Sequence, residues 1–101
     1  MQTQSLKQTY YKDDDVHFEI ERCGGEIFIH CTVTKWSLSV LRRAYHIFSQ
    51  FIIDSQNKGF KRIITLSPNP RFAKLFGGST IYSLIQNNIE YEVIEWDLKL
   101  L

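Results

Sequence analysis

The chain has 101 residues, of which 44% are hydrophobic and 14% aromatic. This length supports one domain with one core and excludes two. The net charge of +1 excludes a protein that is strongly basic or strongly acidic as a whole. No run of about eighteen apolar residues occurs, so we expect neither a signal peptide nor a membrane-spanning helix. We therefore expect a cytoplasmic protein.

Residues 1–15 are predicted to be a polar leader, in which residues 6–11 can form a short strand or a turn, and a single domain is predicted over residues 16–101. The segment VHFEIERCGGEIFIHCTV, which begins at Val16, is typical of a β-hairpin with its turn at Gly24–Gly25. If Cys23 faces Glu26, one face carries only apolar side chains: Val16, Phe18, Ile20, Ile27, Ile29, Cys31 and Val33. Cys31 is therefore expected in the core, and both cysteines are expected to be reduced.

The pattern of residues Ser37–Lys58 predicts one long helix, capped by Ser37 and ended by Gly59. Its apolar side chains recur at helical spacing and are expected to face the sheet: Leu38, Leu41, Tyr45, Phe48 and Ile52, flanked by Val40, Ala44, Ile47 and Phe51. Arg42 and His46 belong to the opposite, solvated arc.

After this helix, Phe60–Leu66 has the composition of a buried strand, which a helical crossover would return parallel to the first hairpin. A second, short helix is expected over Arg71–Phe76, ended by Gly77–Gly78. The tail favours a closing hairpin with its turn at Asn87–Asn88, with a short helix over Ile81–Gln86 as the alternative for its first arm. The fold class is thus α/β (α+β): a mixed sheet with one long and one short helix.

Charge is unevenly distributed, because residues 35–78 carry eight basic side chains against Asp54 alone while acidic residues predominate on both sides. Such a segment can meet phosphates or an acidic protein surface. We favour basic, solvated helix faces, since no nucleic-acid-binding motif accompanies them.

Three side chains of the first hairpin, His17, Glu19 and His30, can share its outer face. A metal site would need a further ligand, and none stands at ligand spacing. We therefore predict a bond between Glu19 and His30 and assign neither a metal site nor catalytic residues.

The run KGFKRIITLSPNPRFAKLFGG, residues 58–78, is similar to a passage of the GCN5-related N-acetyltransferase (GNAT) family, with Asn69, Ala73, Phe76 and Gly78 near the family's positions. The order hairpin, long helix, strand, short helix, hairpin also resembles the second half of that fold. Among its members, compact versions encoded by tailed phages look most similar. The resemblance implies acetyl-CoA as a cofactor, held by Lys35, Ser37 and Asn69.

Three departures from the family pattern argue against acetyl transfer. The junction at residues 34–39 lacks the glycines that let backbone amides approach a pyrophosphate, and Trp36 stands there. The short helix offers Leu75 and Phe76 where the family places a tyrosine general acid. The family's additional elements ahead of the hairpin have no counterpart in residues 1–15.

We therefore favour a noncatalytic, phage-encoded protein that acts by contact with a protein partner, in virion assembly or on a host protein. An acyltransferase with an atypical coenzyme site and a nucleic-acid-binding protein are the alternatives, and a second copy of the chain is an alternative partner. The expected contact residues combine large aromatic and basic side chains: Trp36, Arg42, His46, Tyr91 and Trp96.

Overall fold

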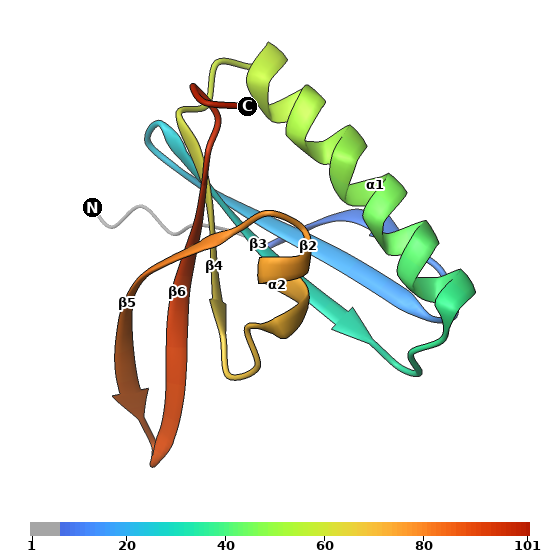
Figure 1. Ribbon diagram of the computed structural model, residues 1–101. Coiled ribbons are helices and arrows are strands. Elements are labelled where there is room, and N and C mark those ends of the chain that lie inside the picture. Colours follow the sequence, from blue (N-terminus) through green and yellow to red (C-terminus); the bar gives the residue numbers. More distant parts are fainter. Residues whose placement is uncertain (1–6) are drawn as a thin grey trace.

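A computed structural model of the chain describes residues 7–101. It contains two helices and a six-stranded sheet (Figure 1). In chain order, the elements are β1 (Gln8–Lys12), β2 (Val16–Cys23), β3 (Glu26–Val33), α1 (Leu38–Asn57), β4 (Arg62–Ser67), α2 (Arg71–Leu75), β5 (Ser79–Gln86) and β6 (Ile89–Asp97). The strand order in the sheet is β1-β2-β3-β4-β6-β5. The predicted mixed α/β architecture is confirmed.

The first hairpin has the predicted register, with Cys23 opposite Glu26 and Val16 opposite Val33. Gly24 has φ +62°, a backbone conformation that favours glycine in a tight turn. Alternation along the two strands then places their apolar side chains on the face that meets α1, and those of β2 are buried.

The stretch ahead of this hairpin is more structured than a polar leader, because Gln8–Lys12 forms β1 and pairs antiparallel with β2. The Tyr10 ring packs edge-on against Phe51, with the ring centroids 5.0 Å apart. Its hydroxyl donates a hydrogen bond of 2.5 Å to Asp54 of α1. Burial and this bond raise the pKa of Tyr10. Of the two options for residues 6–11, a short strand or a turn, the structure thus contains the strand, at Gln8–Lys12. Residues 1–6 of the expected leader lie outside the described residues.

The turn between β1 and β2 is also tied to α1. Arg43 donates a hydrogen bond of 2.5 Å to Asp13 and a longer one of 3.4 Å to Asp15. Hydrogen bonds from the Tyr11 hydroxyl and from Arg43 lower the pKa of Asp13. The first strand and its turn are thus held against α1 by polar side chains that are far apart in the sequence.

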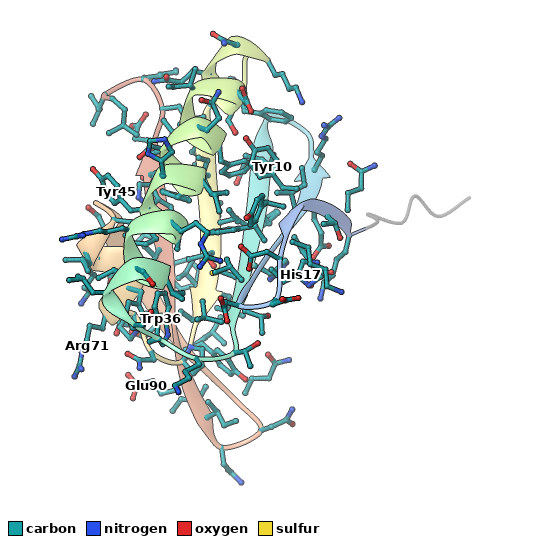
Figure 2. The ribbon with its side chains drawn as sticks, turned by 90° about the vertical axis from the view of Figure 1, so that its right-hand side faces the viewer. Tyr10, His17, Trp36, Tyr45, Arg71 and Glu90 are labelled. Atoms are coloured by element: carbon teal, nitrogen blue, oxygen red, sulfur yellow. The ribbon has the colours of Figure 1, made fainter. Side chains whose placement is uncertain are left out.

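The long helix begins and ends as predicted: the Ser37 hydroxyl accepts a hydrogen bond from the Val40 amide, and Gly59 follows the helix with φ +82°. Its buried face is rotated from the predicted one. The buried residues are Val40, Ala44, Phe48, Phe51 and Ser55, whereas Leu38 and Tyr45 are exposed. Figure 2 shows Tyr45 at the side of α1, at the left of the view. The Tyr45 ring contacts the edge of α2 at Phe76 instead of entering the core.

The strand after α1 returns parallel to the first hairpin as predicted, with Ile27 opposite Ile63. The short helix α2 follows, with Pro70 at its start and Gly77 at φ +96° after its end. Both helices lie on the same face of the sheet, since the Phe48 and Phe76 rings are 5.6 Å apart. No helix covers the opposite face within the described residues.

The closing hairpin is confirmed and the alternative helix over Ile81–Gln86 is wrong. Asn87 and Asn88 both have positive φ, 53° and 64°, as a two-residue hairpin turn requires. In Figure 1 this hairpin projects beyond the rest of the sheet, with β5 outermost.

Candidate functional site

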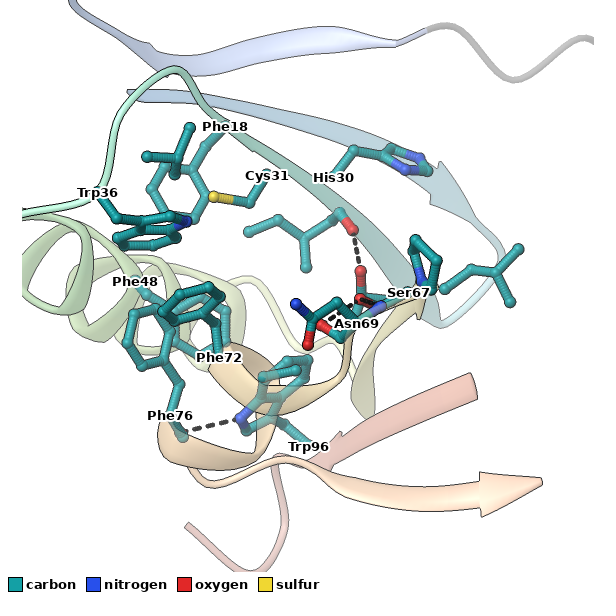
Figure 3. A pocket seen from close by; sticks show the side chains of 16 residues that line it. Phe18, His30, Cys31, Trp36, Phe48, Ser67, Asn69, Phe72, Phe76 and Trp96 are labelled. Carbon is teal, nitrogen blue, oxygen red and sulfur yellow. Dashed lines mark hydrogen bonds between the residues drawn. The ribbon is translucent and has the colours of Figure 1, made fainter. Parts of the chain in front are cut away.

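The sheet opens between its two parallel strands. β3 and β4 pair only over Glu26–Phe28 and Arg62–Ile64. The Thr65 hydroxyl then donates a 2.7 Å hydrogen bond to the Ile29 carbonyl, and the strands are no longer paired beyond that point. A pocket of about 380 Å³ lies there, between the parted strands and the two helices (Figure 3).

Aromatic rings form much of the pocket wall. Trp36, from the segment before α1, stacks on Phe72 of α2 with centroids 3.8 Å apart and planes 18° from parallel. Phe48 and Phe76 continue the wall, and Trp96 closes it by donating a 3.1 Å hydrogen bond from Nε1 to the Phe76 carbonyl. The stack joins the start of α1 to α2, so these helices are held together across the pocket.

The polar groups of the pocket are mostly engaged in local turns. The Ser67 hydroxyl accepts from the Asn69 amide and donates to the Asn69 carbonyl, at 3.1 and 2.8 Å. The Asn69 side-chain oxygen accepts from the Arg71 amide at 3.4 Å. Asn69 therefore belongs to the turn that leads into α2, and its side-chain amide nitrogen remains to meet a ligand.

The prediction that Cys31 lies in the core is wrong. Its register and face are as expected, but its side chain reaches the pocket and is solvent-accessible, because β4 no longer runs beside β3 at this level. The apolar lining still desolvates the thiol and raises its pKa to about 11. Cys31 is therefore a neutral thiol at physiological pH and a poor nucleophile.

His30 is the other titratable residue at the pocket, but its ring lies on the opposite face of β3. There Nε2 is 2.7 Å from a carboxylate oxygen of Glu21. The predicted bond between Glu19 and His30 is thus wrong, although the two residues stand opposite each other in the register. His30 instead contacts Glu21, which lies diagonally across the strand pair, two residues along β2 from the directly opposed Glu19. His17 is hydrogen-bonded to Thr9 at 3.0 Å and lies 4.0 Å from Glu19.

The three residues that the resemblance assigns to acetyl-CoA differ in their surroundings. Asn69 lines the pocket, whereas Lys35 is exposed ahead of α1. The Ser37 hydroxyl is engaged by the Val40 amide, so it already satisfies one of the first amides of the helix. In residues 7–101, no group of three or more His, Cys, Asp and Glu side chains could hold a metal ion.

The five expected contact residues also lie on different surfaces. Arg42 and His46 are exposed on the outer side of α1, whereas Trp36 is half-buried beside α2. Tyr91 is half-buried in β6. Trp96 is only 3% exposed, which corrects the expectation that it is an exposed contact. The Trp96 indole fills space that is free because residue 78 is glycine. A Cβ at Gly78 would stand 2.9 Å from the Trp96 ring.

Sequence reasoning missed the roles of Thr65 and Phe72. Thr65 is the polar position between Ile64 and Leu66, and it marks the level at which the strands part. For Phe72, nothing local in the sequence distinguishes a ring that stacks on Trp36 from one that is simply buried.

Neither a protein-family model nor a curated protein matches the sequence. Solved structures do match, among them aminoglycoside 6'-acetyltransferase type Ii, with a TM-score of 0.71 and 11% identity. A proposed acetyltransferase from Agrobacterium tumefaciens has a TM-score of 0.63 and 15% identity, and one of the GNAT family from Desulfovibrio desulfuricans has 0.67 and 15%.

The matches cover 87%, 93% and 87% of this chain, in the same order, but only 66%, 74% and 65% of those proteins. The chain thus spans about two thirds of the first of them. At these identities the comparison establishes the fold alone. The mixed six-stranded sheet with one long and one short helix is a GNAT-like fold.

Proposed function

We propose that this protein is a noncatalytic member of the GNAT-like fold that acts by contact with another protein. The observation that carries the proposal is the chemistry of the pocket: Cys31 and His30 are its titratable residues within the described part of the chain. The thiol is kept neutral, and the imidazole is turned to the other face of the sheet. Neither can readily protonate a departing thiolate in the pocket, and Leu75 and Phe76 carry no hydroxyl.

The contact surface that we propose is the closing hairpin. It bears large apolar side chains that are exposed to solvent, namely Ile81, Tyr82, Ile85 and Ile89. Leu66 of the neighbouring β4 is exposed as well. Tyr82, Ile89 and Leu66 lie on one face of the sheet, and Ile81 and Ile85 lie on the other. Exposed apolar side chains gathered on one hairpin favour a protein interface over an isolated surface position. The setting, virion assembly or action on a host protein, stays a prediction from the resemblance to phage proteins.

An acyltransferase with an atypical coenzyme site is the second candidate, and one observation favours it. The strands part and leave a pocket of about 380 Å³ with an aromatic wall, instead of closing over a filled core. A narrow acyl chain fits such a space, and the unpaired backbone of β3 can bond amide groups. The Trp36–Phe72 stack narrows this same space.

Nucleic-acid binding receives less support, because three of the eight basic side chains in residues 35–78 are paired with acids. Arg62 bridges Glu26 and Glu95 at 3.0 and 2.6 Å, and Lys74 is 3.4 Å from Glu92. The third, Arg43, is held by the turn between β1 and β2. Pairing of this kind lowers the number of cations that are free to meet phosphates.

Calorimetry with acetyl-CoA separates the first two candidates. We expect no measurable heat of binding for the parent chain up to about 1 mM ligand, which corresponds to a binding free energy weaker than about −4 kcal/mol. An active GNAT acetyltransferase measured under the same conditions is the positive control. Binding in the micromolar range would contradict a coenzyme-independent role and favour the acyltransferase.

No helix within the described residues is both long and apolar enough to cross a membrane.

A further inference from the structure

We propose that β5 pairs antiparallel with β5 of a second copy, about a twofold axis at Ser83, so that two sheets join into one. The second copy is then the partner that binds the contact surface named under the proposed function. The pairing rests on that function only because both use the closing hairpin.

β5 is an edge strand that lacks the usual protection against pairing. It is eight residues long and contains neither a charged residue nor proline. Among residues 7–101, its only neighbour in the sheet is β6. Natural edge strands are commonly protected by such residues or by covering elements. Here Ile81, Tyr82 and Ile85 are 42%, 57% and 75% exposed. An open, neutral and apolar edge is suited to strand addition.

The other edge of the sheet is different. β1 is five residues long, contains Lys12 and has a bulge between Thr9 and Tyr11. It is also fastened to α1 by the bond between Tyr10 and Asp54. Because short length, charge and irregularity all disfavour pairing, β5 is the edge that can receive another strand.

The residues of β5 are arranged symmetrically around Ser83. Tyr82 and Leu84 flank it, Ile81 and Ile85 follow, and polar Thr80 and Gln86 come next. Antiparallel pairing about Ser83 therefore sets Tyr82 opposite Leu84 of the second copy, and Ile81 opposite its Ile85. No charged side chains are opposed, since the strand has none.

The faces of the sheet agree with this register. Tyr82 and Leu84 stand opposite Val93 and Tyr91 of β6, on the face that no helix covers in the described part of the chain. A twofold axis perpendicular to the sheet keeps each face on its own side, so residues pair only with residues of the same face. Centring the pair on Leu84 instead would set Tyr82 opposite Gln86.

A bulge limits the length of the contact. The pairing of β5 with β6 shifts between Thr80 and Tyr82, and Thr80 stands opposite Ile94. The regular edge available to a second copy is therefore about Ile81–Ile85. This is smaller than a standard-size stable interface, which uses about 20–30 residues a side. The dimer should accordingly form as protein concentration rises.

Sedimentation equilibrium over about 1–200 µM tests the association, because a weak dimer is governed by mass action. We expect a monomer–dimer equilibrium for the parent and its loss in Ser83→Lys, where two ammonium groups would face each other at the axis. Gln86→Lys adds the same charge outside the paired segment and should still dimerise. Both positions are exposed, and thermal melts would verify that both variants fold.

The register is tested by a cross-link in a Cys23→Ser, Cys31→Ser background. Ser83→Cys places two thiols opposite each other, and opposed Cα atoms of antiparallel strands lie about 4.5–5.5 Å apart, within disulfide reach. Oxidation should give a disulfide-linked dimer for Ser83→Cys and little for Leu84→Cys, whose partner is Tyr82.

A parent that stays monomeric throughout, a Ser83→Lys variant that dimerises like Gln86→Lys, or preferential cross-linking of Leu84→Cys would overturn the proposed pairing. These outcomes are independent of acyl transfer. A monomer would leave the noncatalytic proposal standing, and turnover of acetyl-CoA would leave the sedimentation result unchanged.

Discussion

Replacing Phe48 with alanine is expected to lower the free energy of unfolding by roughly 3–5 kcal/mol, through lost burial and a residual cavity. Phe48 is only 2% exposed and its ring contacts Phe51, Phe76 and Trp96, so it joins α1, α2 and the sheet. Denaturant titration followed by tryptophan fluorescence would measure the loss.

The matched control is His46→Ala, two residues away on the exposed side of the same helix, which should change stability by less than about 0.5 kcal/mol. A larger loss for His46→Ala than for Phe48→Ala would mean that the buried face of α1 is misassigned.

Gly78→Ala is expected to destabilise the fold by about 1–3 kcal/mol, although it adds a single methyl group. The new Cβ would stand 2.5 Å from Ile94 Cγ2 and 3.0 Å from the Ala73 backbone carbonyl oxygen. The Gly78 amide also bonds that carbonyl, so the backbone has little room to retreat. Thermal or denaturant unfolding would report the change.

Gly25→Ala serves as the comparison, because its Cβ would make only an ordinary contact, 3.7 Å from the Lys61 side chain. We expect its effect to stay under about 1 kcal/mol. Equal losses in the two variants would show that close packing around Gly78 is not the cause.

Both hairpins could be predicted from the sequence because their signals are local. Gly24–Gly25 and Asn87–Asn88 set the turns, and alternation then fixes which side chains share a face. The parallel pairing of β4 with β3 could also be predicted from the sequence, because a helix connects the two strands.

The rotation of α1 could not be predicted, because nine apolar positions span about half of the helix. Which part of that arc meets the sheet depends on the position of α2, whose Phe76 contacts Tyr45 from the side. Because of this tertiary packing, Ser55 is buried and Tyr45 is exposed, although helical spacing alone favours the reverse.

The pocket was also hidden from sequence reasoning. Alternation placed Cys31 correctly on the apolar face, but whether that face is covered depends on where β3 and β4 part. For Trp96 the sequence suggested a contact residue, but the side chain is buried. Gly78, remote in sequence, makes room for the indole.

Release of coenzyme A would show whether the pocket has the machinery for acyl transfer. The protein would be incubated with acetyl-CoA and a panel of primary amines, and the free thiol followed with a chromogenic disulfide. A sample of the same protein without acetyl-CoA gives the signal of its two own thiols, which is subtracted. We predict that thiol appears no faster than in the protein-free blank. Amine-dependent release that scales with protein concentration would contradict the account.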